Sequence, residues 1–272
     1  MDAKNSSANS GNVAVAVKTA AKSILSAPGL GGRNKFRVEV LSAMTNPQQV
    51  IWAAMHQDYS EGFVADDRDR FPDERKAGEL ILKHLLRGNR GHFGPLEHPQ
   101  IVFNVGYFPH STMQQLRTHR VGVSFDVQSM RYSGMRVVDV AEGKRDVEDV
   151  FYLRPVGDYR DRQGKQYFYS EEQRQADLEW CLLGCQRYRD RIQDGLSEEH
   201  ARGLIPFDFR QHFVLSCNAR SLMHLLDLRA KADAQLEIQK LCELLMEHFR
   251  AWMPEIATWY EEKRLAKARL SP

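Results

Sequence analysis

The segment Ile101-Val102-Phe103-Asn104-Val105-Gly106-Tyr107-Phe108 is rich in β-branched and aromatic residues and lies between Pro99 and Pro109. This composition favours a β-strand, and the two prolines set its limits. Further strand patterns occur at residues 36–41, 136–140 and 150–153. The predicted strands therefore all lie in the first 153 residues.

The remaining regular segments have helical patterns. Ser170 followed by Gln173 forms a capping box before a long helix. Its predicted buried stripe is Leu178, Cys181, Leu182, Cys185, Tyr188 and Ile192. Other helices are predicted over 47–56, from Pro72 to just before Gly88, and over 207–230, 234–251 and 254–265. Because strands come early and helices late, we predict an α+β fold with a central, mostly antiparallel sheet and a helical C-terminal half.

Residues 1–34 differ from the rest of the chain in composition. They are low in complexity and end in Pro28-Gly29-Leu30-Gly31-Gly32. We predict a flexible N-terminal arm over 1–34 and a folded domain over 35–272. The alternative is a transit peptide, since the arm has no acid after Asp2, although it lacks the usual Arg-rich amphipathic face.

Composition excludes several classes of protein. The 38 Lys and Arg against 36 Asp and Glu give a net charge of +2, which argues against a protein that coats nucleic acid. With 42% hydrophobic and 27% charged residues the chain is globular. The sequence contains no run of about 18 apolar residues, so it predicts no membrane span. Four cysteines without framework spacing predict a reduced, cytoplasmic protein, and Cys181 and Cys185 suit a helix core better than redox chemistry.

The common glycine-rich phosphate motifs are absent from the sequence. There is no Gly-x-Gly-x-x-Gly after a strand and no P-loop, and His-Glu-x-x-His, Cys-x-x-Cys and Gly-x-Ser-x-Gly are also missing. A nucleotide or phosphate ligand must therefore be bound by side chains.

Arginines gather in an unusual stretch over 114–134. It contains three Arg, one His and three Gln, while Asp126 is its only acid and Lys is absent. Guanidinium groups without acidic neighbours suit an anionic ligand, because each offers a planar fork to phosphate or carboxylate oxygens. The alternative is that these arginines pair with distant acids such as Glu97 or Asp227.

Two further polar sets accompany this stretch. Arg202 and a group formed by Asn218, Arg220, His224 and Arg229 lie in the C-terminal half, where the simpler interpretation is the polar side of an amphipathic helix. The third set is His92, Glu97 and His98. We expect these histidines to hydrogen-bond the backbone and therefore predict no metal. A metal site is the alternative.

Together the three sets resemble the flavin-dependent thymidylate synthase family. The family hallmark is Arg-His-Arg, seven residues and a Ser, followed closely by Arg-Tyr. Here eight residues separate Arg117-Thr118-His119-Arg120 from Ser129-Met130-Arg131-Tyr132. The resemblance covers about residues 36 to 260 in the family's order and includes Gly91-His92, Pro95-x-Glu97-His98, Arg202-x-x-x-Pro206, Asn218-Ala219-Arg220-Ser221-Leu222, Leu228-Arg229 and Ala234-Gln235-x-Glu237-Ile238.

The sequence departs from the family pattern in the hallmark itself. Thr118 separates the first Arg from His119, and the gap to Ser129 is one residue longer. A one-residue insertion restores the register with Arg117, His119 and Arg120 as the trio, so that either Arg117 or Thr118 faces the ligand. The position of His224 is commonly Asn in the family.

The resemblance implies an activity, its cofactors and an assembly. Family members convert dUMP to dTMP with a methylene group from 5,10-methylenetetrahydrofolate, which leaves as tetrahydrofolate, while NADPH reduces a bound FAD. The implied fold is the thymidylate synthase-complementing fold, assembled as a homotetramer with its sites where subunits meet. The expected partners are small molecules, dUMP and the folate, with no nucleic acid and no membrane.

The resemblance also implies roles for individual residues. FAD would be held by seven residues: Arg117, His119, Arg120, Asn218, Arg220, His224 and His92. The substrate dUMP would be held by another seven: Gln114, Arg117, Ser129, Met130, Arg131, Arg202 and Arg229. Arg229 is the expected catalytic residue, because a cation at the uracil edge stabilises negative charge as N3 ionises and makes C5 a better nucleophile.

The family uses no cysteine nucleophile, and no Cys of this chain lies in the motifs. Ser129 has no His or Lys close in sequence to activate it, so we predict a binding role for it. Two alternatives remain: a flavin or nucleotide oxidoreductase that does not methylate, and an RNA- or nucleotide-binding module without enzymatic activity.

Overall fold

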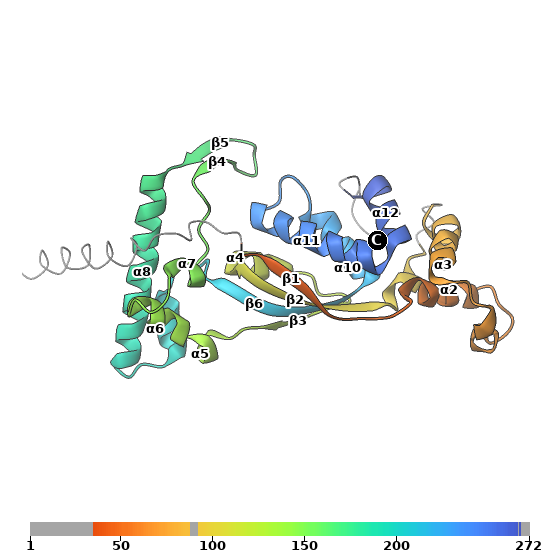
Figure 1. Ribbon diagram of the computed structural model, residues 1–272, viewed down its shortest axis with the longest axis horizontal. Coiled ribbons are helices and arrows are strands. Elements are labelled where there is room, and N and C mark those ends of the chain that lie inside the picture. Colours follow the sequence, from red (N-terminus) through yellow and green to blue (C-terminus); the bar gives the residue numbers. More distant parts are fainter. Residues whose placement is uncertain (1–34, 88–91, 266, 268–272) are drawn as a thin grey trace, which may run out of the picture. The chain divides into compact units, whose positions relative to one another are not determined.

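The computed structural model describes residues 35–87, 92–265 and 267 (Figure 1). The flexible arm predicted over 1–34 lies outside the described residues. From Lys35 onward the chain forms two compact units. One, here called the sheet unit, comprises Lys35–Val127, Asp161–Lys165 and the chain from Gln211. The other, here called the helical unit, comprises Gln128–Arg160 and Gln166–Arg210.

A four-stranded sheet organises the sheet unit. Its strand order is β1 (Arg37–Ala43), β2 (Gln100–Pro109), β6 (Arg210–Asn218) and β3 (Val123–Val127). The pairs β1–β2 and β3–β6 are antiparallel, with Val38 opposite Val105 and Phe125 opposite Leu215. The predicted strands at 36–41 and 101–108 and the predicted antiparallel sheet are confirmed.

Helices bury one set of strand side chains. Figure 1 shows α10 (Ala219–Arg229) and α11 (Leu236–Trp252) along one face of the sheet. Phe103 and Leu215 on the strands share one core with Leu225, Leu241 and Phe249 on these helices, all of them fully buried. Burial of such side chains stabilises the fold by about 1.5–3 kcal/mol each. The same core includes residues of α2 (Pro47–Gln57), α3 (Glu74–Ile81) and α12 (Pro254–Lys263).

Short elements connect these helices and strands. The helical turns Val64–Arg70 and Gly94–Glu97 are 3-10 in type, and Leu82–Leu86 continues α3 as a π-helical turn. Helix α4 (His110–Leu116) follows β2 directly, with the turn before β3 after it. The helices predicted over 47–56, after Pro72, over 234–251 and over 254–265 are confirmed.

The helical unit is built around α8 (Glu171–Gln193). The predicted capping box is present: Oγ of Ser170 accepts the backbone N–H of Gln173 at 3.2 Å, and Oε1 of Gln173 accepts that of Ser170 at 3.0 Å. The predicted stripe on α8 is buried from Leu178 to Tyr188. Helix α8 packs against α6 (Met135–Ala141), α7 (Val147–Val150), α9 (Glu198–Ala201) and the 3-10 turn Arg202–Leu204, and α5 (Met130–Ser133) packs against α9. A hairpin of β4 (Gly157–Arg160) and β5 (Gln166–Tyr169) completes the described elements.

Two predicted strands in the helical unit are wrong. Residues 136–140 lie in helix α6, where Val137, Val138 and Val140 pack into the core around α8. Residues 150–153 follow α7, a single turn, and form only an isolated bridge between Phe151 and Phe209. In both places packing against α8 outweighs the preference of valine for strands, which is a weak guide.

The helix predicted over 207–230 is wrong in its first half. Residues Arg210–Asn218 form strand β6, and the helix begins only at Ala219. In β6 the side chains of Phe213, Leu215 and Cys217 alternate into the core, which is the period of a strand. Strands are therefore not confined to the first 153 residues, and β6 brings the C-terminal motif into the middle of the sheet.

Candidate functional site

Arg229, the last residue of α10, is held at the end of α4. Its Nε donates a hydrogen bond to Nε2 of His119 at 3.1 Å. Its Nη2 donates to the carbonyl oxygen of Gln115 at 3.1 Å and to Oγ1 of Thr118 at 2.8 Å. The C-terminal end of a helix carries partial negative charge, which favours a cation there. We refer to His119, Gln115 and Thr118 as the Arg229 clamp.

All three groups of the clamp are neutral. The pKa of His119 is lowered to about 4, mainly by burial and in the same direction by the nearby Arg229 and His224 side chains. The imidazole is therefore uncharged near pH 7. Because Nε2 accepts a hydrogen bond from Arg229, its proton lies on Nδ1. The guanidinium charge is consequently not neutralised by a carboxylate within the clamp.

A hollow of about 270 Å³ lies beside the clamp. Its lining combines hydrogen-bonding and cationic side chains with an apolar wall and consists of Thr118, His119, Arg120, Val121, Val123, Ser221, His224 and Leu228. The His224 ring stands edge-on to the His119 ring at a centroid distance of 5.6 Å. Nδ1 of His224 is buried and has no hydrogen-bond partner among the residues that the structure describes. A bound ligand could satisfy it.

Gly122 allows the turn after α4 to lie against the start of α10. Its φ is +64°, which favours glycine, and a Cβ there would come within 2.3 Å of Oγ of Ser221 and 2.4 Å of Nδ2 of Asn218. The turn is tied to the helix by a bond from Oγ of Ser221 to the carbonyl of Val121 at 2.8 Å. Position 122 therefore requires glycine for two reasons: the positive φ of the residue and the close approach of the turn to α10.

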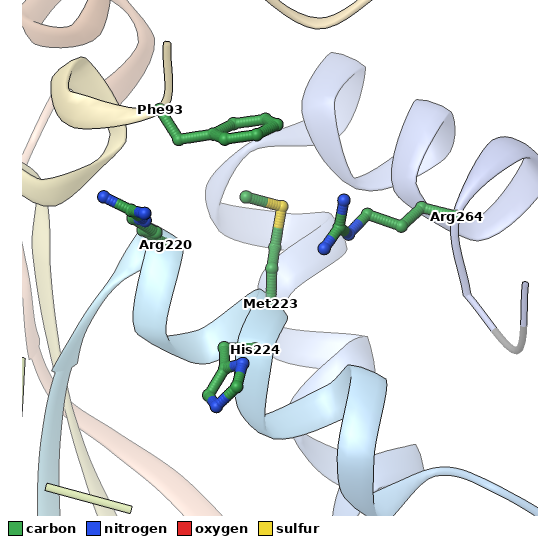
Figure 2. Close-up of a pocket in the computed structure, with 5 residues that line it drawn as sticks. All are labelled: Phe93, Arg220, Met223, His224 and Arg264. Carbon is green, nitrogen blue, oxygen red and sulfur yellow. The ribbon is translucent and has the colours of Figure 1, made fainter. Parts of the chain in front are cut away.

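A narrow crevice borders the other side of His224 (Figure 2). Figure 2 shows Met223 pointing toward the Phe93 ring, with the side chain of Arg264, the residue that follows α12, on the other side of Met223. Arg264 lies 5.9 Å above the Phe93 ring and pairs with buried Asp227 at 2.7 Å. Arg220 pairs with Glu97 at 2.5 Å. Glu97 and Asp227, the distant acids considered from the sequence, thus pair with Arg220 and Arg264 and not with the 114–134 stretch.

The predicted flavin residues are only partly gathered. His119, Arg120 and His224 line the hollow, and Arg220 lines the crevice. Asn218 is buried, and its Oδ1 caps α10 by accepting the backbone N–H of Ser221 at 2.8 Å.

The other two lie apart from the hollow. His92 bonds Asp58 at 2.8 Å and lines neither cavity. Arg117 is exposed and outside both, while its neighbour Thr118 lines the hollow. Of these two, Thr118 is therefore the residue that the structure places at the site.

The predicted substrate residues fall in both units. Gln114, with its amide nitrogen 2.7 Å from Nε2 of His110, belongs to the sheet unit with Arg117 and Arg229. The helical unit holds the other four, namely Ser129, Met130, Arg131 and Arg202.

In the helical unit, Ser129 caps α5 by accepting the backbone N–H of Arg131 at 3.3 Å. The Arg131 side chain pairs with Glu199 at 2.9 Å, and both are exposed. Arg202 is exposed and has no ion pair with any residue that the structure describes. Met130 is 4% exposed and belongs to the core, so its side chain is structural.

Sequence reasoning missed the apolar wall, Ser221 and the crevice residues Phe93, Met223 and Arg264 as parts of the site. Ser221 lies inside the Asn-Ala-Arg-Ser-Leu motif, and this was the available signal. Leu228 and Phe93 also lie within the matched motif stretches. Val121, Val123, Met223 and Arg264 belong to no such motif, and only the packing of the chain places them there.

No metal site or reactive thiol accompanies the hollow. Within residues 35–87, 92–265 and 267, no group of three or more His, Cys, Asp or Glu side chains could hold a metal ion. Burial raises the pKa of each of the four free thiols to about 12. None of the described helices has the length and hydropathy needed to cross a membrane.

Comparisons with known proteins show which family the sequence matches. The family model described as thymidylate synthase complementing protein matches residues 39–255. The flavin-dependent thymidylate synthase of Haloarcula marismortui is 34% identical over 251 residues, or 86% of this chain and 99% of the relative. That of Halobacterium salinarum is 34% identical over 87% of this chain and 100% of the relative.

Solved structures show the same fold. The UMP/dUMP methylase PolB from Streptomyces cacaoi bound with 5-Br dUMP has a TM-score of 0.66 and 24% identity, covering 85% of this chain and 97% of that one. The same enzyme bound with 5-Br UMP has a TM-score of 0.63 and 24% identity, covering 90% and 100%.

The buried, neutral His119 predicts a pH dependence of stability. Its pKa is about 4 in the folded protein against 6.5 ordinarily, so the unfolded chain binds the proton more tightly. The free energy of unfolding should therefore fall as the pH is lowered from about 6.5 to about 4, and the His119 contribution is fully present only above this window. In His119→Gln this part of the decline should disappear.

Urea unfolding measured at several pH values tests this prediction. His84→Gln is the matched control, because His84 is exposed in the same unit. A decline in His119→Gln as steep as in the wild type would show that His119 is not the titrating group.

Proposed function

The chain belongs to the thymidylate synthase complementing protein family, and we propose that it converts dUMP to dTMP as a flavin-dependent thymidylate synthase. One molecule each of dUMP, 5,10-methylenetetrahydrofolate and NADPH with one proton would give dTMP, tetrahydrofolate and NADP⁺. The observation in this structure that carries the proposal is Arg229, a cation fixed by neutral groups beside a hollow of mixed polarity.

The residues of the sheet unit fit a flavin dinucleotide. Arg120 is exposed at the hollow and forms no ion pair with any described residue, so it suits a pyrophosphate. Nδ1 of His224 is a buried atom in need of a partner. The family match adds Asn218 and Arg220 and, more distantly, Arg117 and His92. FAD bound there would supply the hydride that reduces the transferred methylene to a methyl group.

The substrate residues divide between phosphate and base. Ser129, Arg131 and Arg202 suit the phosphate dianion, because the planar fork of a guanidinium group matches the geometry of phosphate oxygens. Gln114, Arg117 and Met130 also follow from the family match, and the burial of Met130 leaves its backbone as the part that contacts a ligand.

Arg229 would face the uracil edge. As N3 loses its proton, negative charge spreads over the ring and C5 gains nucleophilic character. A guanidinium without a carboxylate partner stabilises that charge more strongly than a neutralised one, because its field is not cancelled. The buried thiols, with their raised pKa, offer no thiolate to attack the ring instead.

The hollow is small for the ligands proposed. Its 270 Å³ is just below the range of about 300–1,000 Å³ that is typical of small-molecule sites. This supports the proposal that the enzyme is a homotetramer whose sites are completed by neighbouring subunits. Light scattering should then give a mass near four times 31.3 kDa; a monomeric mass in the active enzyme would contradict it.

A single anaerobic turnover tests the function directly. Purified protein with FAD, NADPH, 5,10-methylenetetrahydrofolate and dUMP should form dTMP, with tetrahydrofolate as the folate product and a requirement for FAD. Oxidation of NADPH without dTMP would favour the oxidoreductase alternative. A colourless protein that binds RNA with steep salt dependence would favour the RNA-binding alternative.

Replacement of Arg202 tests the phosphate role. Arg202→Ala should raise KM for dUMP by about 10- to 100-fold, the loss expected for a charged hydrogen bond. Turnover of deoxyuridine, which lacks the phosphate, should be unchanged. Arg187→Ala is the matched control, because Arg187 is exposed on α8 of the same unit without an ion pair to any described residue. Equal losses with dUMP and deoxyuridine would exclude a phosphate contact.

A further inference from the structure

We propose that Thr118, which interrupts the hallmark motif, is a positioning residue that orients Arg229 so that Nη1 alone faces the substrate. The family pattern places no such role here, since Thr118 stands where the chain departs from it. Because Nη1 would meet the uracil edge, the inference rests on the function proposed above.

Two contacts fix the hydrogen-bonding roles of the Thr118 hydroxyl, as a donor in one and an acceptor in the other. Its oxygen lies 2.7 Å from the carbonyl of Gln115, to which it can only donate. The hydroxyl has a single proton, so the oxygen must accept in its contact with Nη2 of Arg229 at 2.8 Å. Threonine is β-branched and few rotamers are open to it, which keeps this hydroxyl in place.

A count of the Arg229 donors shows what remains for a ligand. The guanidinium has five N–H groups. One on Nε goes to His119, and the two on Nη2 go to Gln115 and Thr118. The two on Nη1 have no acceptor among the residues that the structure describes. A pair of free donors on one nitrogen suits an edge with adjacent acceptors, as in a uracil that has lost its N3 proton between two carbonyls.

Loss of the Thr118 hydroxyl removes one of the two acceptors of Nη2. The guanidinium is then held by Nε and one Nη2 contact, and it can rotate toward other acceptors. A small misorientation of a charged group costs catalysis more than binding, because the charge that it stabilises develops only in the transition state. The expected effect is therefore on kcat.

Helix α4 offers a matched control in Thr112. This residue is fully buried, and its Oγ1 has no hydrogen-bond partner within the described part of the chain. Thr112→Val removes a hydroxyl from the helix that precedes Thr118 without removing a contact to Arg229. Thr118→Val keeps the shape of the side chain and removes the hydroxyl, and Thr118→Ser keeps the hydroxyl.

The experiment measures kcat, KM for dUMP and the flavin content of the three variants and the wild type. Thr118→Val should lose about 10- to 100-fold in kcat, the loss expected for a hydrogen bond to a charged group, with flavin content and melting temperature near wild type. Thr118→Ser should recover most of kcat, and Thr112→Val should match the wild type.

Three results would overturn the inference: full kcat in Thr118→Val, equal losses in Thr118→Val and Thr112→Val, or a loss of kcat that follows a loss of bound flavin. If the wild type itself forms no dTMP, the proposed function fails and a second readout decides on Thr118. Crystal structures of the wild type and Thr118→Val would then show either a rotated Arg229, which supports the positioning role, or an unmoved one, which overturns it.

Discussion

Arg229 keeps its orientation only while His119 offers it an unprotonated ring nitrogen. A proton on Nε2 would replace an acceptor with a donor and set two cations 3.1 Å apart. Burial in the sheet unit prevents this, because a charged imidazole loses its hydration there. The core that packs α4, β3 and α10 together therefore serves the site twice. It brings the groups within reach, and it keeps the histidine neutral.

The site also requires that the turn at Gly122 lie close against α10. Ser221 and Asn218 lie where any side chain at residue 122 would be, so the turn has to pass at glycine. The same two residues are satisfied locally: Asn218 caps the helix, and Ser221 bonds the carbonyl of Val121. Their polar groups are thus used within the protein, while His224 and Arg120, which line the hollow, are left for a ligand.

Sequence patterns predict those parts of this fold in which one local signal dominates. The prolines around β2 and the capping box at Ser170 are of that kind. Strand β6 was not predicted from the sequence because Asn218 both ends the strand and caps the next helix. The helical spacing after Asn218 was extended back over Phe213, Leu215 and Cys217, whose alternation is that of a strand. Helix α6 was not predicted because its valines favour a strand by intrinsic preference, whereas in the folded protein they pack against α8 as a helix.

The same distinction applies to the site. Motif order predicts His119, Arg120 and His224, which the fold gathers, but it cannot separate them from Arg117 and His92, which lie apart. What a motif omits is burial. Burial makes Met130 a core residue, keeps His119 neutral and keeps the thiols protonated. The thiols are protonated and Ser129 caps a helix, so neither offers an activated nucleophile, and this fits the proposed role of Arg229, the stabilisation of an anionic ring.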